Sequence, residues 1–198
     1  MILFGLHSGE ASKIMGNFFV ISLFNRLNSI IFGIKQLPQL LIKLMNTLIC
    51  TEPGRFKYKS VPEPVSAKGR AIIRIQRIGI CGTDLHAFEG TQPYFTYPRV
   101  LGHELAGELI SYDDAAGFTT GEAVTFIPYF NCGQCIACRN NKPNCCTQMQ
   151  VCGVHVDGGM AEYLSVPSST LLHGQGLSVD QLALVEPLSI GAHGIRRA

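Results

Sequence analysis

Four cysteines lie close together in the middle of the chain, with the spacing of a metal site. Two residues separate Cys132 from Cys135 and Cys135 from Cys138, and Cys146 follows after seven more. Four thiolates this close in sequence are typical of a structural zinc ion, which they surround completely. Disulfides fit two-residue gaps poorly, and a secretory signal fits the N-terminal residues poorly. We therefore expect zinc to hold the loop-like lobe 131–146 rigid in place of an apolar core.

Three further cysteines allow different interpretations. Cys145 is adjacent to Cys146, so the identity of the fourth ligand stays open between these two residues. Cys50 and Cys152 lie far from the four-cysteine run. We expect both to be small buried residues rather than ligands, because free cysteine is among the most buried residue types.

A second set of candidate ligands is spread along the chain. Cys81 lies in the run GICGTDLH, His103 and Glu104 are adjacent, and Glu186 precedes a proline near the end. A sulfur, a nitrogen and carboxylate oxygens form a mixed set that leaves room for water or substrate on a catalytic zinc. Each residue alone is weak evidence, since a single cysteine is usually part of the core and His103 with Glu104 suits a surface pair.

The elements that must position these residues are mostly short strands. Runs of alternating or continuous apolar residues, separated by turn residues, predict strands at 47–50, 57–61, 71–80, 123–127 and 161–166. Residues 100–112 contain two glycines and suggest a loop that leads into a further strand. Only 178–198 has a helical pattern. The pattern favours a β-rich barrel or sandwich.

Composition excludes several classes of protein. The 198 residues are 46% apolar and 15% charged, which is enough apolar surface for one domain or slightly more. A net charge of +2 argues against a dedicated nucleic-acid binder. No run of 18 apolar residues is present, so we expect no membrane-spanning helix in the main body.

Residues 1–44 differ from the rest and form an unassigned leader. Their bases are Lys13, Arg26, Lys35 and Lys43, and their one acid is Glu10. Residues 37–44 suggest a short amphipathic helix. A basic, acid-poor leader suits a targeting segment or an interfacial membrane helix. We favour a third interpretation, upstream sequence translated from an early start codon, with the main body beginning at Met45.

Several motifs together resemble one enzyme family. GICGTDLHAFEG, PRVLGHELAGEL, the four-cysteine lobe, GGMAEYLSVP and EPLSIGAHGIRR occur in the order typical of zinc-dependent medium-chain dehydrogenases/reductases. From Met45 to Ala198 the sequence resembles the polyol, threonine and sugar-acid branch, and most closely the galactonate and gulonate 5-dehydrogenases. The leader is not covered.

The resemblance implies a fold and a division of the chain. Residues 45–188 would form a mainly β, GroES-like catalytic domain, a partly open β-barrel with the zinc lobe, and 189–198 would start a helix toward a cofactor domain. Nicotinamide enzymes usually bind their cofactor on a Rossmann unit with the motif G-x-G-x-x-G. That motif is absent from this sequence. We therefore expect an N-terminal fragment without turnover of its own.

The resemblance also implies roles for individual residues. Cys81, His103 and Glu104 would surround a catalytic zinc, with Glu186 as a further or alternating ligand, often through water. Thr83 would hydrogen-bond the substrate hydroxyl, and His86 would pass its proton outward. The substrate pocket would include Phe88, Tyr94 and Tyr129. For Asp84 we prefer a purely local role in the turn or helix cap.

The expected ligands follow from these roles. They are two zinc ions per chain, NAD or NADP in the full-length protein, and a small alcohol: a sugar acid such as galactonate or gulonate, then a sorbitol-like polyol or L-threonine. A cytoplasmic homo-oligomer without nucleic-acid partners is expected. Two alternatives stay open: a non-catalytic zinc-binding fragment, and a zinc-binding interaction module. An interaction module predicts a basic or aromatic stripe near the lobe, whereas the lobe has few basic residues, Arg139 and Lys142. A zinc-free quinone-reductase-like relative would lack the cysteines.

Overall fold

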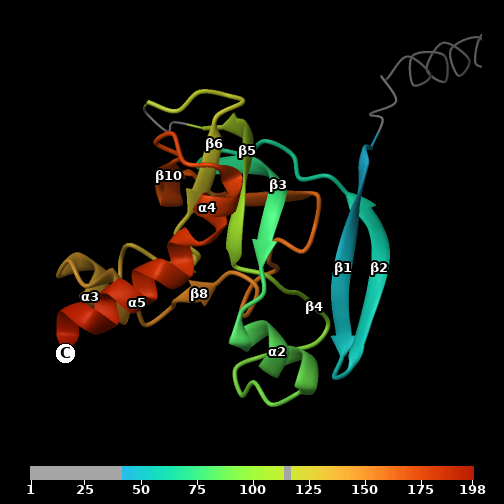
Figure 1. The fold of residues 1–198 in the computed structure, drawn as a ribbon, viewed down its shortest axis with the longest axis horizontal. Helices are drawn as coiled ribbons and strands as arrows, with labels where there is room; N and C mark the ends of the chain where they lie inside the picture. Colours follow the sequence, from blue (N-terminus) through green and yellow to red (C-terminus); the bar gives the residue numbers. More distant parts are fainter. Residues whose placement is uncertain (1–41, 114–116) are drawn as a thin grey trace, which may run out of the picture. The chain divides into compact units, whose positions relative to one another are not determined.

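A computed structural model describes residues 42–113 and 117–198. The predictions for the leader therefore lie outside the described residues, except at its end. There, the expected helix over 37–44 is wrong in its last three residues, because 42 and 43 are not helical and Leu44 already belongs to a strand. The predicted mainly β fold is confirmed: strands dominate from Leu44 onward (Figure 1). In the described part of the chain the strands form three sheets that do not close into a barrel.

The central sheet is antiparallel, with the strand order β10-β6-β5-β3-β9 (Figure 1). Its strands are β3 (Arg70–Gly79), β5 (Glu104–Tyr112), β6 (Ala123–Phe126), β9 (Tyr163–Pro167) and β10 (Leu171–His173). Ile73 of β3 packs with Leu109 and Val166 in the main core, while Arg74 of the same strand stays exposed. Burying the apolar face of β3 stabilises the sheet through the hydrophobic effect. Cys152 lies in this core, as predicted.

A second sheet borders the central one. It consists of β1 (Leu44–Glu52), β2 (Arg55–Pro62) and β4 (Arg99–Val100), in the order β2-β1-β4. Its inner side contributes to a separate core in which Cys50 is fully buried, as predicted, together with Leu101 and Ala87. The rings of Phe56 and Phe88 stack with their centroids 5.0 Å apart, which joins β2 to the helix that carries Phe88.

The cysteine lobe contains little regular structure. It is framed by β7 (Tyr129–Phe130) and β8 (Gln150–Val151), which pair with each other, and contains α3 (Ile136–Arg139) and the 3-10 turn η1 (Pro143–Cys145). Neither α3 nor η1 contributes a buried residue. The lobe therefore has no apolar core of its own to hold these turns in place.

The helices at the end of the chain agree with the prediction, and one helix was missed. The predicted region forms α4 (Val179–Ala183) and α5 (Val185–Arg197), which follow the 3-10 turn η2 (Ser168–Thr170) in the chain. Helix α5 begins at Val185, before the expected boundary at 189, so Glu186 lies in its first turn. Helix α2 (Gly82–Glu89) was not predicted. It is short and weakly amphipathic, and it depends on its caps, with Gly90 ending it at a φ of 81°.

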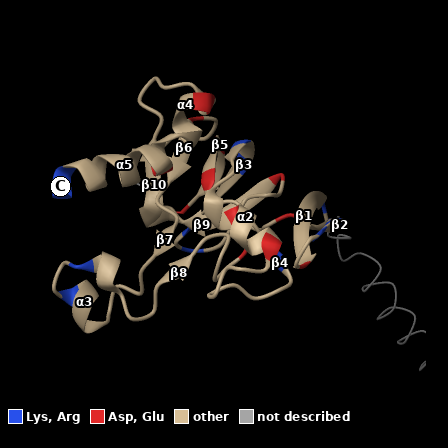
Figure 2. Ribbon diagram, turned by 60° about the horizontal axis from the view of Figure 1, so that its bottom comes forward, with Lys and Arg blue, Asp and Glu red and all other residues tan. Residues whose placement is uncertain are grey.

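The distribution of charged residues and the apolar character of the helices agree with the expectations from composition. Figure 2 shows positive residues at a few separate places, including α3 and the C-terminal end of α5. Among the residues that the structure describes, no helix is long and apolar enough to cross a membrane.

Candidate metal centres

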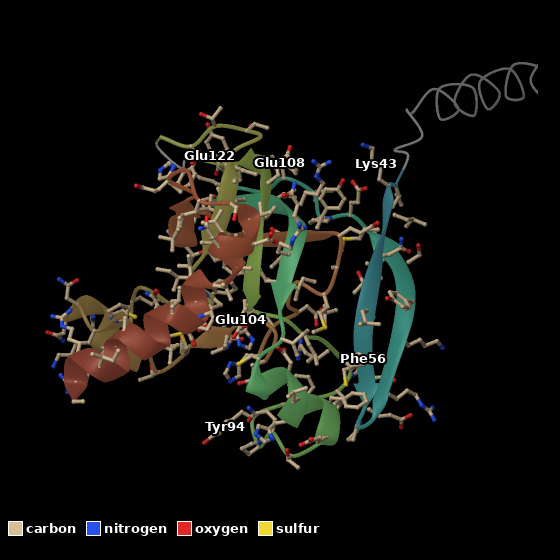
Figure 3. All side chains as sticks on the ribbon, in the orientation of Figure 1. Lys43, Phe56, Tyr94, Glu104, Glu108 and Glu122 are labelled. Atoms are coloured by element: carbon tan, nitrogen blue, oxygen red, sulfur yellow. The ribbon has the colours of Figure 1, made fainter. Side chains whose placement is uncertain are left out.

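The register of two neighbouring strands brings distant candidate ligands to one end of the central sheet. In the antiparallel pair of β3 and β5, Gly79 lies opposite Glu104. Cys81 follows β3 by two residues, and His103 immediately precedes β5. The same register therefore brings Cys81, His103 and Glu104 together, although more than twenty residues separate the first from the others. Figure 3 shows Glu104 at this end of the sheet, close to α2.

Asp84 fastens the two ligand segments to each other. Its Oδ2 accepts a hydrogen bond from the backbone N–H of Cys81 (2.9 Å), and its Oδ1 accepts one from Gly102 (3.0 Å). The first bond caps α2, as expected of Asp84. The second was not predicted, because it joins residues that are distant in sequence. The buried Asp84 carboxylate also lies 4.0 Å from His103 Nδ1.

A second segment supports the loop before Glu104 from the other side. Gly159 donates its N–H to the carbonyl of Gly102 (3.0 Å), and Gly158 donates to that of Val100 (2.8 Å). Gly102 has a φ of 93°, which favours glycine. A Cβ atom on Gly158 would lie 2.3 Å from the carbonyl oxygen of Gly102. The ligand loop is therefore fixed by backbone contacts on both sides.

The three side chains form a mixed donor group, called here the mixed site. A sulfur of Cys81, a ring nitrogen of His103 and a carboxylate oxygen of Glu104 all lie within 4.8 Å of one another. His103 Nδ1 is buried and has no hydrogen-bond partner among the residues that the structure describes. Glu104 is buried and forms no ion pair with a Lys or Arg of the described residues. Buried charges are normally paired or bound to a metal, so the site fits a cation such as zinc.

The structure places Glu186 beside the mixed site but outside it. Its carboxylate does not belong to the group of atoms within 4.8 Å. Glu186 is buried in the first turn of α5, and its Oε1 accepts a hydrogen bond from the hydroxyl of Tyr129 (2.9 Å). Burial, the bond to Glu186 and the negative charges of Cys81 and Glu104 raise the pKa of Tyr129. Tyr129 is therefore a neutral hydrogen-bond donor to Glu186.

The remaining candidate residues lie on or after α2. Thr83 is partly buried in the first turn, and His86 is exposed one turn later, with Nδ1 3.0 Å from Thr91 Oγ1. No hydrogen bond joins Thr83 to His86 within the described residues. Of the expected pocket residues, Phe88 packs against Phe56, and Tyr94 is exposed beyond α2 (Figure 3). Tyr129 donates a hydrogen bond to Glu186.

A substitution at Gly79 should disturb the mixed site. A Cβ atom there would lie 2.2 Å from Glu104 Oε2 and 2.8 Å from its Cβ, so Gly79→Ala must displace this side chain. We expect zinc affinity at the mixed site to fall about tenfold or more, as for other neighbours of metal ligands. Competition with a chelator measures it. Gly82→Ala is the matched control, because no atom lies within 4 Å of its Cβ position. Equal affinities in both variants would contradict the expectation.

The cysteine lobe brings four sulfurs together, called here the thiol site. The Sγ atoms of Cys132, Cys135, Cys138 and Cys146 lie within 4.8 Å of one another. The adjacent Cys145 is exposed and is not part of this group. The structure thus favours Cys146 over Cys145 as the fourth donor. All eight cysteines are free of disulfides.

Backbone N–H groups point at these sulfurs. Cys146 Sγ accepts from Cys132 and Gln148, and Cys132 Sγ accepts from Cys135, each at 3.3 Å. Such bonds stabilise thiolates. Backbone bonds from Gln134 and Cys135 lower the pKa of Cys132, and those from Cys138 and Thr147 lower that of Cys135 to about 5. Loss of hydration and the neighbouring Cys135 raise the pKa of Cys138 to about 11.

These shifts predict how zinc binding at the thiol site depends on pH. At neutral pH Cys135 is a thiolate, whereas Cys138 still holds a proton that zinc must displace. Zinc affinity should therefore rise with pH below the pKa of Cys138, by about tenfold per pH unit for each displaced proton. Competition with a chelator of known affinity at pH 6, 7 and 8 tests this. An affinity that does not change over this range would contradict it.

The roles of three residues at the mixed site were not predicted from the sequence. Asp84 was assigned only to the cap, Gly79 was not singled out, and Tyr129 was assigned to the pocket but not to Glu186. Gly79 carries the one signal in the sequence, a glycine at the end of a predicted strand, where close approach of another chain segment is common.

The comparisons with known proteins agree with this architecture. Residues 67–175 match the alcohol dehydrogenase GroES-like domain family. The chain is 46% identical over 155 residues to L-galactonate-5-dehydrogenase of Escherichia coli K12, covering 78% of this chain and 46% of that protein. It is 40% identical over 153 residues to a zinc-type alcohol dehydrogenase-like protein of Haemophilus influenzae, covering 75% of this chain and 45% of that protein.

A solved structure shows the same fold. It is described as that of a zinc-binding dehydrogenase from Sinorhizobium meliloti 1021, bound to NADP. It matches with a TM-score of 0.72 and 30% identity, covering 79% of this chain and 46% of the other. The chain thus spans less than half the length of the relatives that it matches. The family match covers more than half of the chain, and the chain therefore belongs to the alcohol dehydrogenase GroES-like domain family.

Proposed function

We propose that this chain is the zinc-binding, substrate-activating part of an NAD(P)-dependent alcohol dehydrogenase that oxidises a secondary hydroxyl of a sugar acid or polyol. The observation that carries the proposal is the mixed site, where sulfur, nitrogen and oxygen donors approach within 4.8 Å. Three protein ligands with a position left for water or substrate are typical of catalytic zinc. The names of the relatives support the substrate class.

Each site has a distinct proposed task. At the mixed site, Cys81, His103 and Glu104 would hold zinc, which supplies a Lewis acid that polarises the substrate hydroxyl and lowers its pKa. At the thiol site, four cysteines would leave no open position, so a zinc ion there would be structural. It would take the place of the apolar core that the lobe lacks.

Residues of α2 offer a path for the substrate proton. Thr83 and His86 are three residues apart and so lie on one face of the helix. A threonine hydroxyl accepts one proton while donating another, and we propose that Thr83 takes the proton from the substrate hydroxyl. His86 is exposed, and imidazole is a common proton carrier in enzymes, so His86 would release the proton to solvent.

The hydride acceptor requires residues of a different kind. The sequence contains no G-x-G-x-x-G motif, and the described residues form no Rossmann unit of parallel strands. We therefore propose that a separate dinucleotide-binding domain acts with this one. The 198 residues alone should show no turnover with NAD or NADP.

The setting of the protein is also a proposal. Eight free cysteines suit a reducing compartment such as the cytoplasm. Exposed apolar side chains on α5, among them Leu188 and Ile195, suit contact with a cofactor domain or with a second copy in a homo-oligomer.

A chimera tests the proposed function. Residues 45–198 would replace the matching part of the Escherichia coli L-galactonate-5-dehydrogenase. The chimera is assayed for NAD(P)H formation with galactonate, gulonate, sorbitol and L-threonine, beside the 198-residue chain. We expect oxidation of a sugar acid or polyol by the chimera, and none by the chain. A folded chimera with zinc in both sites but without any oxidation would contradict the proposal and favour a non-catalytic zinc-binding domain.

A further inference from the structure

We propose that Tyr129 is a positioning residue that holds the carboxylate of Glu186 out of the metal's coordination shell, so that the fourth position of the mixed site stays open. This inference rests on the proposed function, because it assumes a metal ion at the mixed site. It concerns one contact in this chain, the hydrogen bond from the Tyr129 hydroxyl to Glu186 Oε1 at 2.9 Å.

The position of Glu186 makes such control necessary. The mixed site already has three donors, and a further carboxylate nearby is a competitor for the position that substrate needs. Glu186 is buried and forms no ion pair with a Lys or Arg of the described residues. A bound cation would attract this carboxylate strongly, because charges interact strongly where water is excluded.

The structure restrains Glu186 from two directions. Its backbone lies in the first turn of α5, where Ser189 Oγ donates to the Glu186 carbonyl (2.7 Å). Its carboxylate is bound by Tyr129, which belongs to β7 at the base of the cysteine lobe. The negative charges of Cys81 and Glu104 both act on the Tyr129 hydroxyl, so the group that binds Glu186 is also near these ligands.

Tyr129 also connects the mixed site to a neighbouring cleft. The cleft has a volume of about 810 Å³, and its lining includes Ile127, Tyr129, Asn131 and Met149. The Tyr129 ring therefore lies on the cleft wall while its hydroxyl binds Glu186. An intact thiol site, which orders the lobe, would thereby help to keep the mixed site open.

Cobalt spectroscopy of the 198-residue chain tests the inference without any assay of activity. One equivalent of Zn²⁺ is added first to fill the thiol site, and Co²⁺ is then titrated into the mixed site. Four-coordinate Co²⁺ has intense visible bands, whereas five-coordinate Co²⁺ has weak ones. Azide then competes for the open position and reports its accessibility.

Three variants give separate outcomes. We expect wild type to give intense bands and to bind azide. Tyr129→Phe should shift the intense bands, because the released Glu186 carboxylate takes the position of water on the metal, and it should lower azide affinity about tenfold or more. The double variant Tyr129→Phe, Glu186→Gln should restore both. Glu186→Gln alone should leave the wild-type spectrum unchanged, since Glu186 is not a ligand while Tyr129 holds it.

The results distinguish this inference from the proposed function. Absence of Co²⁺ bands from a second site in wild type would contradict the proposed function and with it the inference. A second site whose spectrum and azide affinity are unchanged by Tyr129→Phe would overturn the inference alone. If Tyr129→Phe does not fold, Glu186→Gln decides: an altered spectrum makes Glu186 a ligand in wild type and overturns the inference, and an unaltered one supports it.

Discussion

Replacing Cys146 with serine is expected to remove one of two zinc ions from the chain and to unfold the cysteine lobe. Cys146 Sγ is one of the four sulfurs of the thiol site, and it accepts two backbone hydrogen bonds. Structural zinc contributes about 10–16 kcal/mol of apparent binding free energy in small zinc-binding peptides. Neither α3 nor η1 buries a side chain that would replace this contribution. The effect should therefore be among the largest of any single substitution.

Cys145→Ser is the matched control for this prediction. The two residues are adjacent, but Cys145 is exposed and lies outside the four-sulfur group. Elemental analysis of zinc and limited proteolysis of the lobe measure the two effects. We expect Cys145→Ser to retain both zinc ions and the resistance of the lobe. If Cys145→Ser loses zinc and Cys146→Ser does not, the assignment of the fourth ligand is wrong.

Replacing His103 with alanine should remove the other zinc ion. His103 is buried, its Nδ1 lies 4.0 Å from Asp84 Oδ1, and this nitrogen has no hydrogen-bond partner in the described part of the chain. Without the imidazole, two ligands remain, Cys81 and Glu104, and their charges are left without a cation. In the chimera described above, we expect kcat/KM to fall by about 10³-fold, since a Lewis acid contributes several kcal/mol.

His193→Ala is the control, because it removes an imidazole outside the mixed site. His193 is exposed on α5. Its substitution should leave both the zinc content and kcat/KM unchanged. Retention of two zinc ions by a folded His103→Ala variant would contradict the assignment of the mixed site, whatever its activity.

The residues of both sites could be predicted from the sequence, but the sequence constrains the geometry of the two sites to different degrees. The thiol site is local: short gaps between Cys132, Cys135, Cys138 and Cys146 constrain the geometry by themselves. Cys81, His103 and Glu104 are brought together only by the pairing of β3 with β5. The pairing of these strands is a tertiary contact that the residue types alone do not predict. The grouping of the three ligands was expected only from the resemblance to a family.

Contacts between distant segments were the least predictable part. Two hydrogen bonds illustrate this: one from Gly102 to Asp84, and one from Tyr129 to Glu186. No pattern in the sequence relates the two partners of either bond. Helix α2 was missed for a related reason, because it is held by its caps and its tertiary contacts rather than by a strong apolar face. Strands with clear alternation, such as β3, were predicted to within a residue at each end.

The extended X-ray absorption fine structure at the zinc edge of the purified 198-residue chain tests the central claim most directly, because it counts the donors in both sites at once. A thiol site and a mixed site filled together predict a mean of about 2.5 sulfurs per zinc at about 2.3 Å, with nitrogen and oxygen donors at about 2.0–2.1 Å. A mean of about four sulfurs per zinc, without nitrogen or oxygen, would show that the thiol site alone holds zinc and would contradict the account of the mixed site.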